Sequence, residues 1–147
     1  MIINITGQAG SGKTTIAREL EKIIKKPIVI DGDELREIFV NKDYSEEGRR
    51  KNITNAYNIA RFLEAKGFIP IIALISPYQD LREDLKSQST VSEIYLTTSQ
   101  VRGREHFFAQ GYVPPKEDFL PVNTDLPLDD CVQQILIYTI EKNGKKG

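Results

Sequence analysis

A glycine-rich stretch near the start of the chain has the residue types and the spacing that hold phosphate groups. In order, its residues are Gly7, Gln8, Ala9, Gly10, Ser11, Gly12, Lys13, Thr14 and Thr15. The glycines let backbone N–H groups turn inward and form an anion cradle at a helix N-terminus. The Lys13 ammonium can then reach the β- and γ-phosphates, and the Thr14 hydroxyl can ligate Mg²⁺. This P-loop pattern, between a predicted strand and a predicted helix, indicates that the chain binds a nucleoside triphosphate.

The P-loop pattern is shared by GTPase switches, ATPase motors and small-molecule kinases. The length of 147 residues argues against a motor. A switch would need a guanine-specifying Asn-Lys-x-Asp segment, and the nearest match, Val-Asn-Thr-Asp at 122–125, lacks the lysine. A kinase should carry anion-binding side chains at the carboxyl ends of the strands, where a second substrate lies.

Two aspartates and an arginine follow the second predicted strand. Asp31 and Asp33 are two residues apart, so both would point to one side if the strand geometry continued. One carboxylate there could orient an attacking hydroxyl or hold a Mg²⁺-bound water, while Arg36 neutralises an acceptor phosphate. Asp-Gly-Asp is equally common at a helix start for purely local capping reasons. From the residues alone, both interpretations stay open.

Two further stretches carry groups suited to an anionic acceptor. Arg49 and Asn52 are three residues apart, on one face of a predicted helix, and could bind one ligand together. The two basic residues between them are expected on a solvated helix face. Pro77 ends a strongly apolar strand, so backbone groups of Ile75 and Ser76 are expected to be exposed at its carboxyl end.

Taken together, these stretches resemble a known kinase family. GQAGSGKTT at 7–15, DGDELR at 31–36, GRRKNI at 48–53 and ISPYQDLRE at 75–83 stand in the order and spacing of adenylyl-sulfate kinase. The resemblance covers residues 1 to 98 and resumes weakly at 111–125 and in the last helix. It implies transfer of the γ-phosphate of ATP to the 3′-hydroxyl of adenylyl sulfate, with Mg²⁺ as cofactor.

The resemblance also implies roles for individual residues. Lys13 and Asp33 would be catalytic, with Asp33 at the reacting hydroxyl. Arg36 and Arg49 would bind the phosphosulfate of the acceptor, with Asn52 helping. The other acceptor contacts that it implies are Asp31, Ile75, Ser76 and Tyr44, the last in place of a family phenylalanine that packs on the acceptor.

The chain departs from the family in two places. Gly48 stands where the family usually has the aspartate of Asp-Arg-x-x-Asn. The long family lid after the fourth strand is reduced to RGREHFFAQGY at 102–112, so its motifs have no counterpart. By analogy with the lid, Arg104 could stack on the ATP adenine, and Phe107 or Phe108 could cover the acceptor. Burial in the core is the more usual role of a phenylalanine.

The elements that would position these residues alternate along the chain. Buried strands are predicted at 1–6, 27–30, 69–75 and 93–97, with a short fifth near 119–123. Predicted helices follow the P-loop and occupy 45–66, 79–87, 99–109 and 128–142. This alternation predicts an α/β three-layer sandwich around a mostly parallel sheet of about five strands, the P-loop nucleoside triphosphate hydrolase and kinase fold.

Periodicity also predicts which helix faces are buried. The helix after the P-loop places five apolar residues on one face: Ile16, Ala17, Leu20, Ile23 and Ile24. Ser45 is the predicted N-cap of the next helix, whose apolar stripe is Ile53, Ala56, Tyr57, Ala60 and Leu63. Cys131, the single cysteine, is expected in the core, and His106, the single histidine, on the surface.

Composition limits the partners. The 20 basic and 21 acidic side chains give a net charge of −1, so no global field attracts nucleic acid or membrane. The apolar runs are shorter than the ~20 residues of a membrane span. With a single cysteine and no secretory pattern, a cytoplasmic location is expected. We predict one P-loop kinase domain over 1–142, a disordered tail over 143–147, and ATP plus a small anionic acceptor as partners, with a homodimer left open.

Two alternatives remain beside an adenylyl-sulfate kinase. The shortened lid motivates a kinase of the same fold that acts on a different nucleotide-linked or sugar-linked hydroxyl. A P-loop protein that binds nucleotide without transferring phosphate is the other, and the intact Lys13, Thr14 and Asp33 argue against it.

Overall fold

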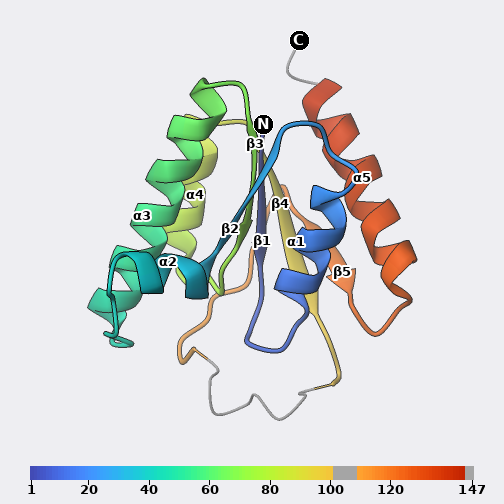
Figure 1. The fold of residues 1–147 in the computed structure, drawn as a ribbon. Coiled ribbons are helices and arrows are strands. Elements are labelled where there is room, and N and C mark those ends of the chain that lie inside the picture. The colour runs from blue at the N-terminus through green and yellow to red at the C-terminus, as the bar shows by residue number, and fades with distance from the viewer. Residues whose placement is uncertain (101–108, 145–147) are drawn as a thin grey trace.

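A computed structural model describes residues 1–100 and 109–144. Five parallel strands form one sheet in the order β2-β3-β1-β4-β5. The strands are β1 (Ile2–Thr6), β2 (Pro27–Asp31), β3 (Ile69–Ala73), β4 (Val91–Thr97) and β5 (Leu120–Asn123). The helices are α1 (Lys13–Glu21), α2 (Gly32–Ile38), α3 (Glu46–Ala65), α4 (Gln79–Gln88) and α5 (Leu128–Gly144). Figure 1 shows α2, α3 and α4 on one face of the sheet and α1 and α5 on the other, so the predicted three-layer α/β fold is confirmed.

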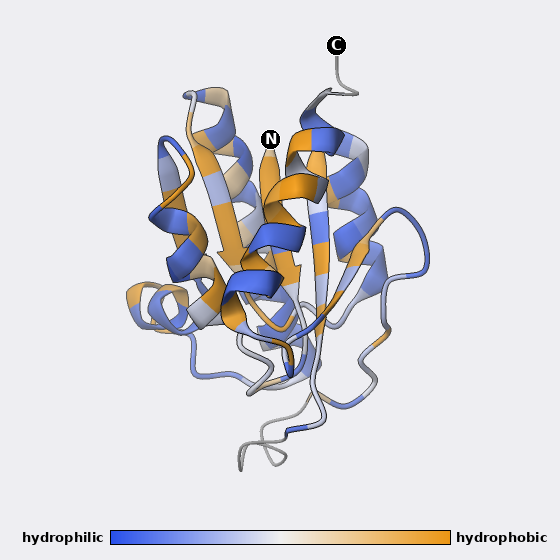
Figure 2. Ribbon diagram, turned by 90° about the vertical axis from the view of Figure 1, so that its right-hand side faces the viewer, coloured by the Kyte–Doolittle hydropathy of each residue, from blue (hydrophilic) through white to orange (hydrophobic). Residues whose placement is uncertain are grey.

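Each face of the sheet has its own apolar core. Ile3 and Ile5 of β1 pack into the core shared with α1 and α5. Ile2 lies in the second core, with residues of α2, α3 and α4. Because successive side chains of a strand point to opposite faces, a strand covered on both sides is mostly apolar on both. Figure 2 shows the outcome: hydrophobic residues gather on the strands, and hydrophilic ones lie on the outer turns of the helices.

The helix faces follow their predicted patterns with one exception. Ile16, Ala17 and Leu20 of α1 are buried, as predicted. The helix ends at Glu21 and Ile23 is 56% exposed, so the prediction that Ile23 lies on the buried helix face was wrong. The N-cap prediction is confirmed: the Ser45 hydroxyl accepts a hydrogen bond from the backbone N–H of Gly48 at the start of α3.

Several predicted boundaries shift. Strand β3 ends at Ala73, before the predicted limit of 75, and β4 begins at Val91. Helix α5 reaches Gly144, so the first two residues of the predicted tail are helical, and residues 145–147 lie outside the described part of the chain. Most of the helix predicted at 99–109 also lies outside it, and residues 99, 100 and 109 are not helical. Among the helices that the structure describes, none is long and apolar enough to cross a membrane.

Candidate active site

A cleft of about 1190 Å³ runs along the carboxyl edge of the sheet. It brings together most of the residues singled out in the sequence: Ala9, Gly10, Gly12, Lys13, Thr14, Thr15, Asp31, Asp33, Arg36, Tyr44, Arg49, Asn52, Ile75 and Ser76. The P-loop and the residues predicted to bind the acceptor line the same cleft. Gly7, Gln8 and Ser11 belong to the P-loop but do not line this cleft, and Arg104, Phe107, Phe108 and His106 lie outside the described residues.

The P-loop is shaped by glycines and by one lysine. Gly10 and Gly12 adopt φ values of 81° and 99°, a region that favours glycine. A Cβ at Gly7 would lie 3.0 Å from the Leu96 carbonyl oxygen, so the turn after β1 leaves no room for a side chain. The Lys13 ammonium donates a hydrogen bond of 2.9 Å to the Gln8 carbonyl and faces the hollow of the loop. This is the shape expected of a phosphate cradle at the start of α1.

Gln8 joins the P-loop to a distant segment. Its side-chain N–H donates to the Ala109 carbonyl at 3.1 Å, and the Ala109 N–H donates to its side-chain oxygen at 2.9 Å. A second tie comes from Thr124 after β5, whose hydroxyl donates to the Ser11 carbonyl at 2.8 Å. The Gln8 side chain thus fixes the loop to the backbone of Ala109, and the Thr124 side chain fixes it to the segment after β5.

The two aspartates face the cleft from different elements. Asp31 is the last residue of β2 and Asp33 lies in the first turn of α2, so the assumption that strand geometry continues to Asp33 was wrong. Asp31 stands at the N-cap position of α2 and Asp33 in its first turn, so the helix start that Asp-Gly-Asp also suggested is present, and both interpretations of the two carboxylates stay open. Burial raises the pKa of Asp31, and the nearby charge of Asp33 raises it further.

Arg36 organises the loop that borders the acceptor side. Its guanidinium donates to the carbonyls of Asn41 at 3.1 Å and Asp43 at 3.0 Å. The centre of the guanidinium lies 4.0 Å from the centroid of the Tyr44 ring, within the range of a cation–π contact. One cationic group thus holds the loop and faces the cleft together with Arg49 of α3.

One buried polar atom on this wall, Oδ1 of Asn52, lacks a hydrogen-bond partner within the described chain, in a residue that is 5% exposed. Ser76 is 1% exposed, and its side chain interacts with the buried Tyr57 hydroxyl. Buried polar atoms in folded proteins nearly always have a partner. An unpaired donor or acceptor beside a cleft is therefore the arrangement that a polar ligand would complete.

The end of β3 differs from its prediction. The backbone of Ile75 and Ser76 was expected to be exposed, but Ser76 is almost fully buried. The Thr6 hydroxyl makes short contacts with both carbonyls, at 2.5 Å to Ile75 and 3.2 Å to Ser76. Both residues line the cleft, as expected. The prediction that Ser76 would be exposed was wrong.

The far end of the cleft was missed in the sequence. Thr124, Leu126, Leu128 and Cys131 line it, beyond the P-loop. The sequence did offer a signal: ligands bind beyond the carboxyl ends of parallel strands, and Thr124 directly follows the predicted fifth strand. Cys131 is buried as predicted, and burial raises the pKa of its thiol.

No group of three or more His, Cys, Asp or Glu side chains that could hold a metal by itself occurs among the described residues. Thr14 and the two aspartates are hard oxygen donors on one cleft, and Mg²⁺ prefers such donors together with phosphate oxygens and water. These residues fit a magnesium ion that arrives with its nucleotide.

A parallel sheet with a glycine-rich loop after β1, opening directly into α1, defines a P-loop nucleotide-binding protein. The chain matches the Adenylylsulphate kinase family over residues 1–106, and it belongs to that family.

Similar proteins cover most of the chain. The Cytidine diphosphoramidate kinase of Campylobacter jejuni is 39% identical over 100 residues, which are 65% of this chain and 59% of that protein. An Adenylyl-sulfate kinase of Pseudomonas aeruginosa is 32% identical over 151 residues, covering 98% of this chain and 64% of that protein. The chain thus spans less than two thirds of the length of both relatives.

A solved structure shares the fold. The Mycobacterium tuberculosis APS kinase CysC in complex with AMPPNP and APS superposes with a TM-score of 0.80 at 23% identity. The similarity covers 94% of this chain and 96% of that one.

Proposed function

We propose that the protein is an ATP-dependent kinase that transfers the γ-phosphate to a hydroxyl of a small anionic acceptor. The observation that carries this proposal is that one cleft is lined both by the phosphate cradle and by Asp33, Arg36 and Arg49. A protein that only bound nucleotide would have no need of a second set of charged groups facing it. Membership of a kinase family supports the same conclusion.

In the proposed reaction the P-loop amides and Lys13 hold the β- and γ-phosphates. Thr14 would hold Mg²⁺, which would supply positive charge to stabilise the phosphates during transfer. Asp33 orients the acceptor hydroxyl, whose oxygen forms the new bond to the γ-phosphorus as the bond to the β-phosphate oxygen breaks. The hydroxyl proton passes to the Asp33 carboxylate or to water, and ADP leaves. Catalysis is mainly alignment and charge stabilisation.

The acceptor that we favour is the 3′-hydroxyl of adenylyl sulfate. Arg36 and Arg49 supply two positive charges for its phosphosulfate, and Oδ1 of Asn52, which lines the same cleft, has no hydrogen-bond partner within the described chain. A cytidine diphosphate-linked acceptor is the second candidate, because a relative with 39% identity is named for that substrate. Both acceptors are anionic nucleotides with free ribose hydroxyls.

An assay of ADP release with purified protein, ATP and Mg²⁺ tests the proposal. The acceptor panel is adenylyl sulfate, cytidine diphosphoramidate, CDP and water alone, and the Lys13→Ala variant is the control for contaminating kinases. Release that needs adenylyl sulfate supports the favoured acceptor, and release that needs the cytidine compound selects the second. A protein that binds ATP and releases no labelled phosphate to any acceptor in single turnover would be a nucleotide binder without transfer activity.

We assign this activity to one domain over residues 1–142, which the helix α5 extends to Gly144. The cytoplasmic location, the homodimer and the absence of nucleic-acid partners stay predictions from the sequence.

A further inference from the structure

A buried arginine lies behind the acceptor wall of the cleft. Arg82 of α4 is 1% exposed and, within the described part of the chain, is not one of the residues that line the cleft. One terminal nitrogen of its guanidinium donates a 2.6 Å hydrogen bond to the Ser76 carbonyl. The other donates to the Val113 carbonyl. A planar fork of donors therefore connects the end of β3 to the segment that follows residue 109.

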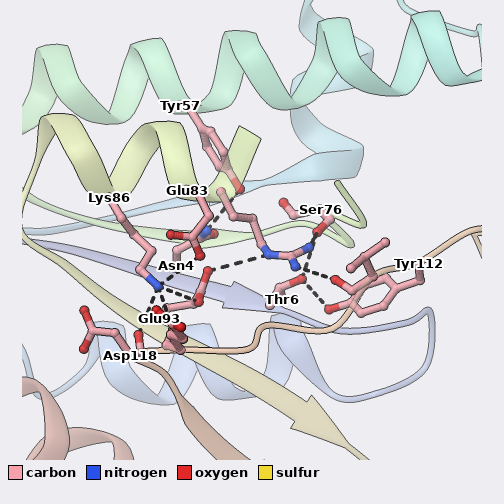
Figure 3. Close-up of polar contacts among 12 residues, drawn as sticks. Asn4, Thr6, Tyr57, Ser76, Glu83, Lys86, Glu93, Tyr112 and Asp118 are labelled. Atoms are coloured by element: carbon pink, nitrogen blue, oxygen red, sulfur yellow. Dashed lines mark hydrogen bonds and ion pairs between the residues drawn. The ribbon is translucent and has the colours of Figure 1, made fainter. Parts of the chain in front are cut away.

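The residue that Arg82 holds has a strained backbone. Ser76 has a φ of 48°, a left-handed conformation that L-residues with a side chain rarely adopt. Such a conformation persists only where the surroundings impose it. Its carbonyl receives the Arg82 guanidinium from one side and the Thr6 hydroxyl from the other. Thr6 also shares a 2.7 Å hydrogen bond with the Tyr112 hydroxyl (Figure 3).

A buried carboxylate holds the guanidinium in turn. Glu93 of β4 is fully buried, and its Oε2 lies 3.6 Å from Nε of Arg82. Its other oxygen accepts a hydrogen bond of 3.2 Å from the Lys86 ammonium (Figure 3). A buried guanidinium without a counter-charge is strongly unfavourable, so Glu93 fixes the place where Arg82 can lie. Glu93, Arg82 and Lys86 thus form a buried ion-pair network behind Ser76, on the side away from the cleft.

We propose that Arg82 is a positioning residue for the acceptor: by fixing the strained Ser76, it sets the wall against which the second substrate binds. The inference rests on the proposed transfer reaction. It predicts that Arg82 controls acceptor binding although it touches neither substrate. A change that weakens acceptor binding equally before and during transfer raises the acceptor KM and leaves kcat unchanged.

The test is the variant Arg82→Lys, which keeps a positive charge for Glu93 but loses the fork that spans two carbonyls. We expect the acceptor KM to rise by about tenfold or more, while the ATP KM and the kcat at saturating acceptor stay within about twofold. The matched control is Arg50→Lys. Arg50 contacts α4 from the solvent side, through hydrogen bonds of 2.8 Å and 3.2 Å to Asp80. The Arg50→Lys variant should leave the acceptor KM, the ATP KM and kcat unchanged.

A second pair of variants separates positioning from simple stability. Arg82→Met removes one of the two cationic partners of Glu93, leaving Lys86, and should lower the melting temperature. Adding Glu93→Gln removes the carboxylate that Arg82 balanced, so we expect the melting temperature to recover in part while the acceptor KM stays raised. An acceptor KM that recovers along with the melting temperature would show that Arg82 only stabilises the fold, and an unchanged KM in Arg82→Lys would overturn the proposal.

The positioning role and the proposed reaction can fail separately. If the wild-type protein turns over no acceptor, the proposed function fails, and hydrogen exchange then decides the role of Arg82. Amides in 74–78 and 112–113 should exchange faster in Arg82→Lys than in the wild type, whereas those of α1 should not change. Equal exchange in both proteins would mean that Arg82 does not fix this wall.

Discussion

Asp31 and Asp33 show how two neighbouring carboxylates acquire different environments. Asp31 ends a strand and is partly buried, and burial together with its neighbour raises its pKa. Asp33 lies one residue into a helix whose start it shares with Glu34. Both line the cleft opposite Lys13, yet only Asp33 was assigned to the reacting hydroxyl.

Replacing Asp33 by Asn should lower the transfer rate by about a hundredfold or more, because an amide cannot accept the hydroxyl proton. ATP affinity should stay within about twofold. Rapid-quench measurement of kcat and titration with a non-hydrolysable ATP analogue check this. Glu34→Gln, one position further along and paired with Arg18 outside, is the matched control. An unchanged rate in Asp33→Asn would remove this carboxylate from the mechanism.

Replacing Arg36 by Ala should weaken the acceptor by about tenfold to a hundredfold, the range expected for a lost charge-assisted hydrogen bond. ATP binding should change little, since Arg36 lies across the cleft from the P-loop. Acceptor KM and ATP KM, measured separately, provide the comparison. Arg61→Ala, at an exposed position of α3, is the control. Equal losses for both substrates would contradict the assigned role.

At the scale of elements, Gly48 explains how the loop before α3 packs. A Cβ at this position would lie 2.1 Å from the Asp43 carbonyl oxygen, closer than any side chain can approach. The loop that carries Tyr44 therefore lies directly against the first turn of α3. The departure from the Asp-Arg-x-x-Asn pattern thus has a structural reason: in this chain the position before Arg49 has no room for an aspartate.

Gly48→Ala should destabilise the protein by about 1–3 kcal/mol through overpacking, although alanine is the better helix former. The acceptor KM should rise as well, because the loop that holds Arg36 and Tyr44 must shift. Thermal or urea unfolding and acceptor kinetics measure the two effects. Gly144→Ala is the control, since a Cβ there meets nothing within 4 Å. A Gly48→Ala protein as stable as the wild type would show that the loop moves freely.

At the scale of the whole molecule, the sheet order places the P-loop at the centre. Strand β1 lies between β3 and β4, so the loop that follows it is flanked by the acceptor side and by the segment after β4. Thr6 ties β1 to the end of β3, and Thr124 ties the loop to the segment after β5. A nucleotide bound at this loop therefore contacts a point to which several strands of the sheet are connected, and we expect its binding to stabilise the whole domain.

A non-hydrolysable ATP analogue with Mg²⁺ should therefore stabilise the protein globally. At a hundred times its Kd, the expected gain is about 2.7 kcal/mol, which corresponds to a rise in Tm of about 5–10 °C for a chain of this size. Calorimetry with and without EDTA checks the contribution of the metal, which should account for much of the rise. Lys13→Ala should show little shift, and Lys22→Ala, an exposed lysine of the same region, should behave as the wild type. A full shift in Lys13→Ala would place the nucleotide elsewhere.

The sequence by itself determined the phosphate cradle, the alternation of strands and helices, and the cleft residues of the P-loop and of the predicted acceptor side. These features are local, because each can be identified from a short stretch of sequence. The P-loop lies within nine residues, a buried strand is an apolar run, and several of the acceptor-side residues follow a predicted strand. The position of Arg82, the strained backbone of Ser76 and the close contact at Gly48 were decided only by the tertiary structure. Arg82 holds Val113 and Glu93, residues far from it along the chain, and no local pattern marks an arginine that will be buried. The strand premise for Asp33 failed although Asp-Gly-Asp is common at a helix start: α2 begins directly at Gly32 and packs on α3.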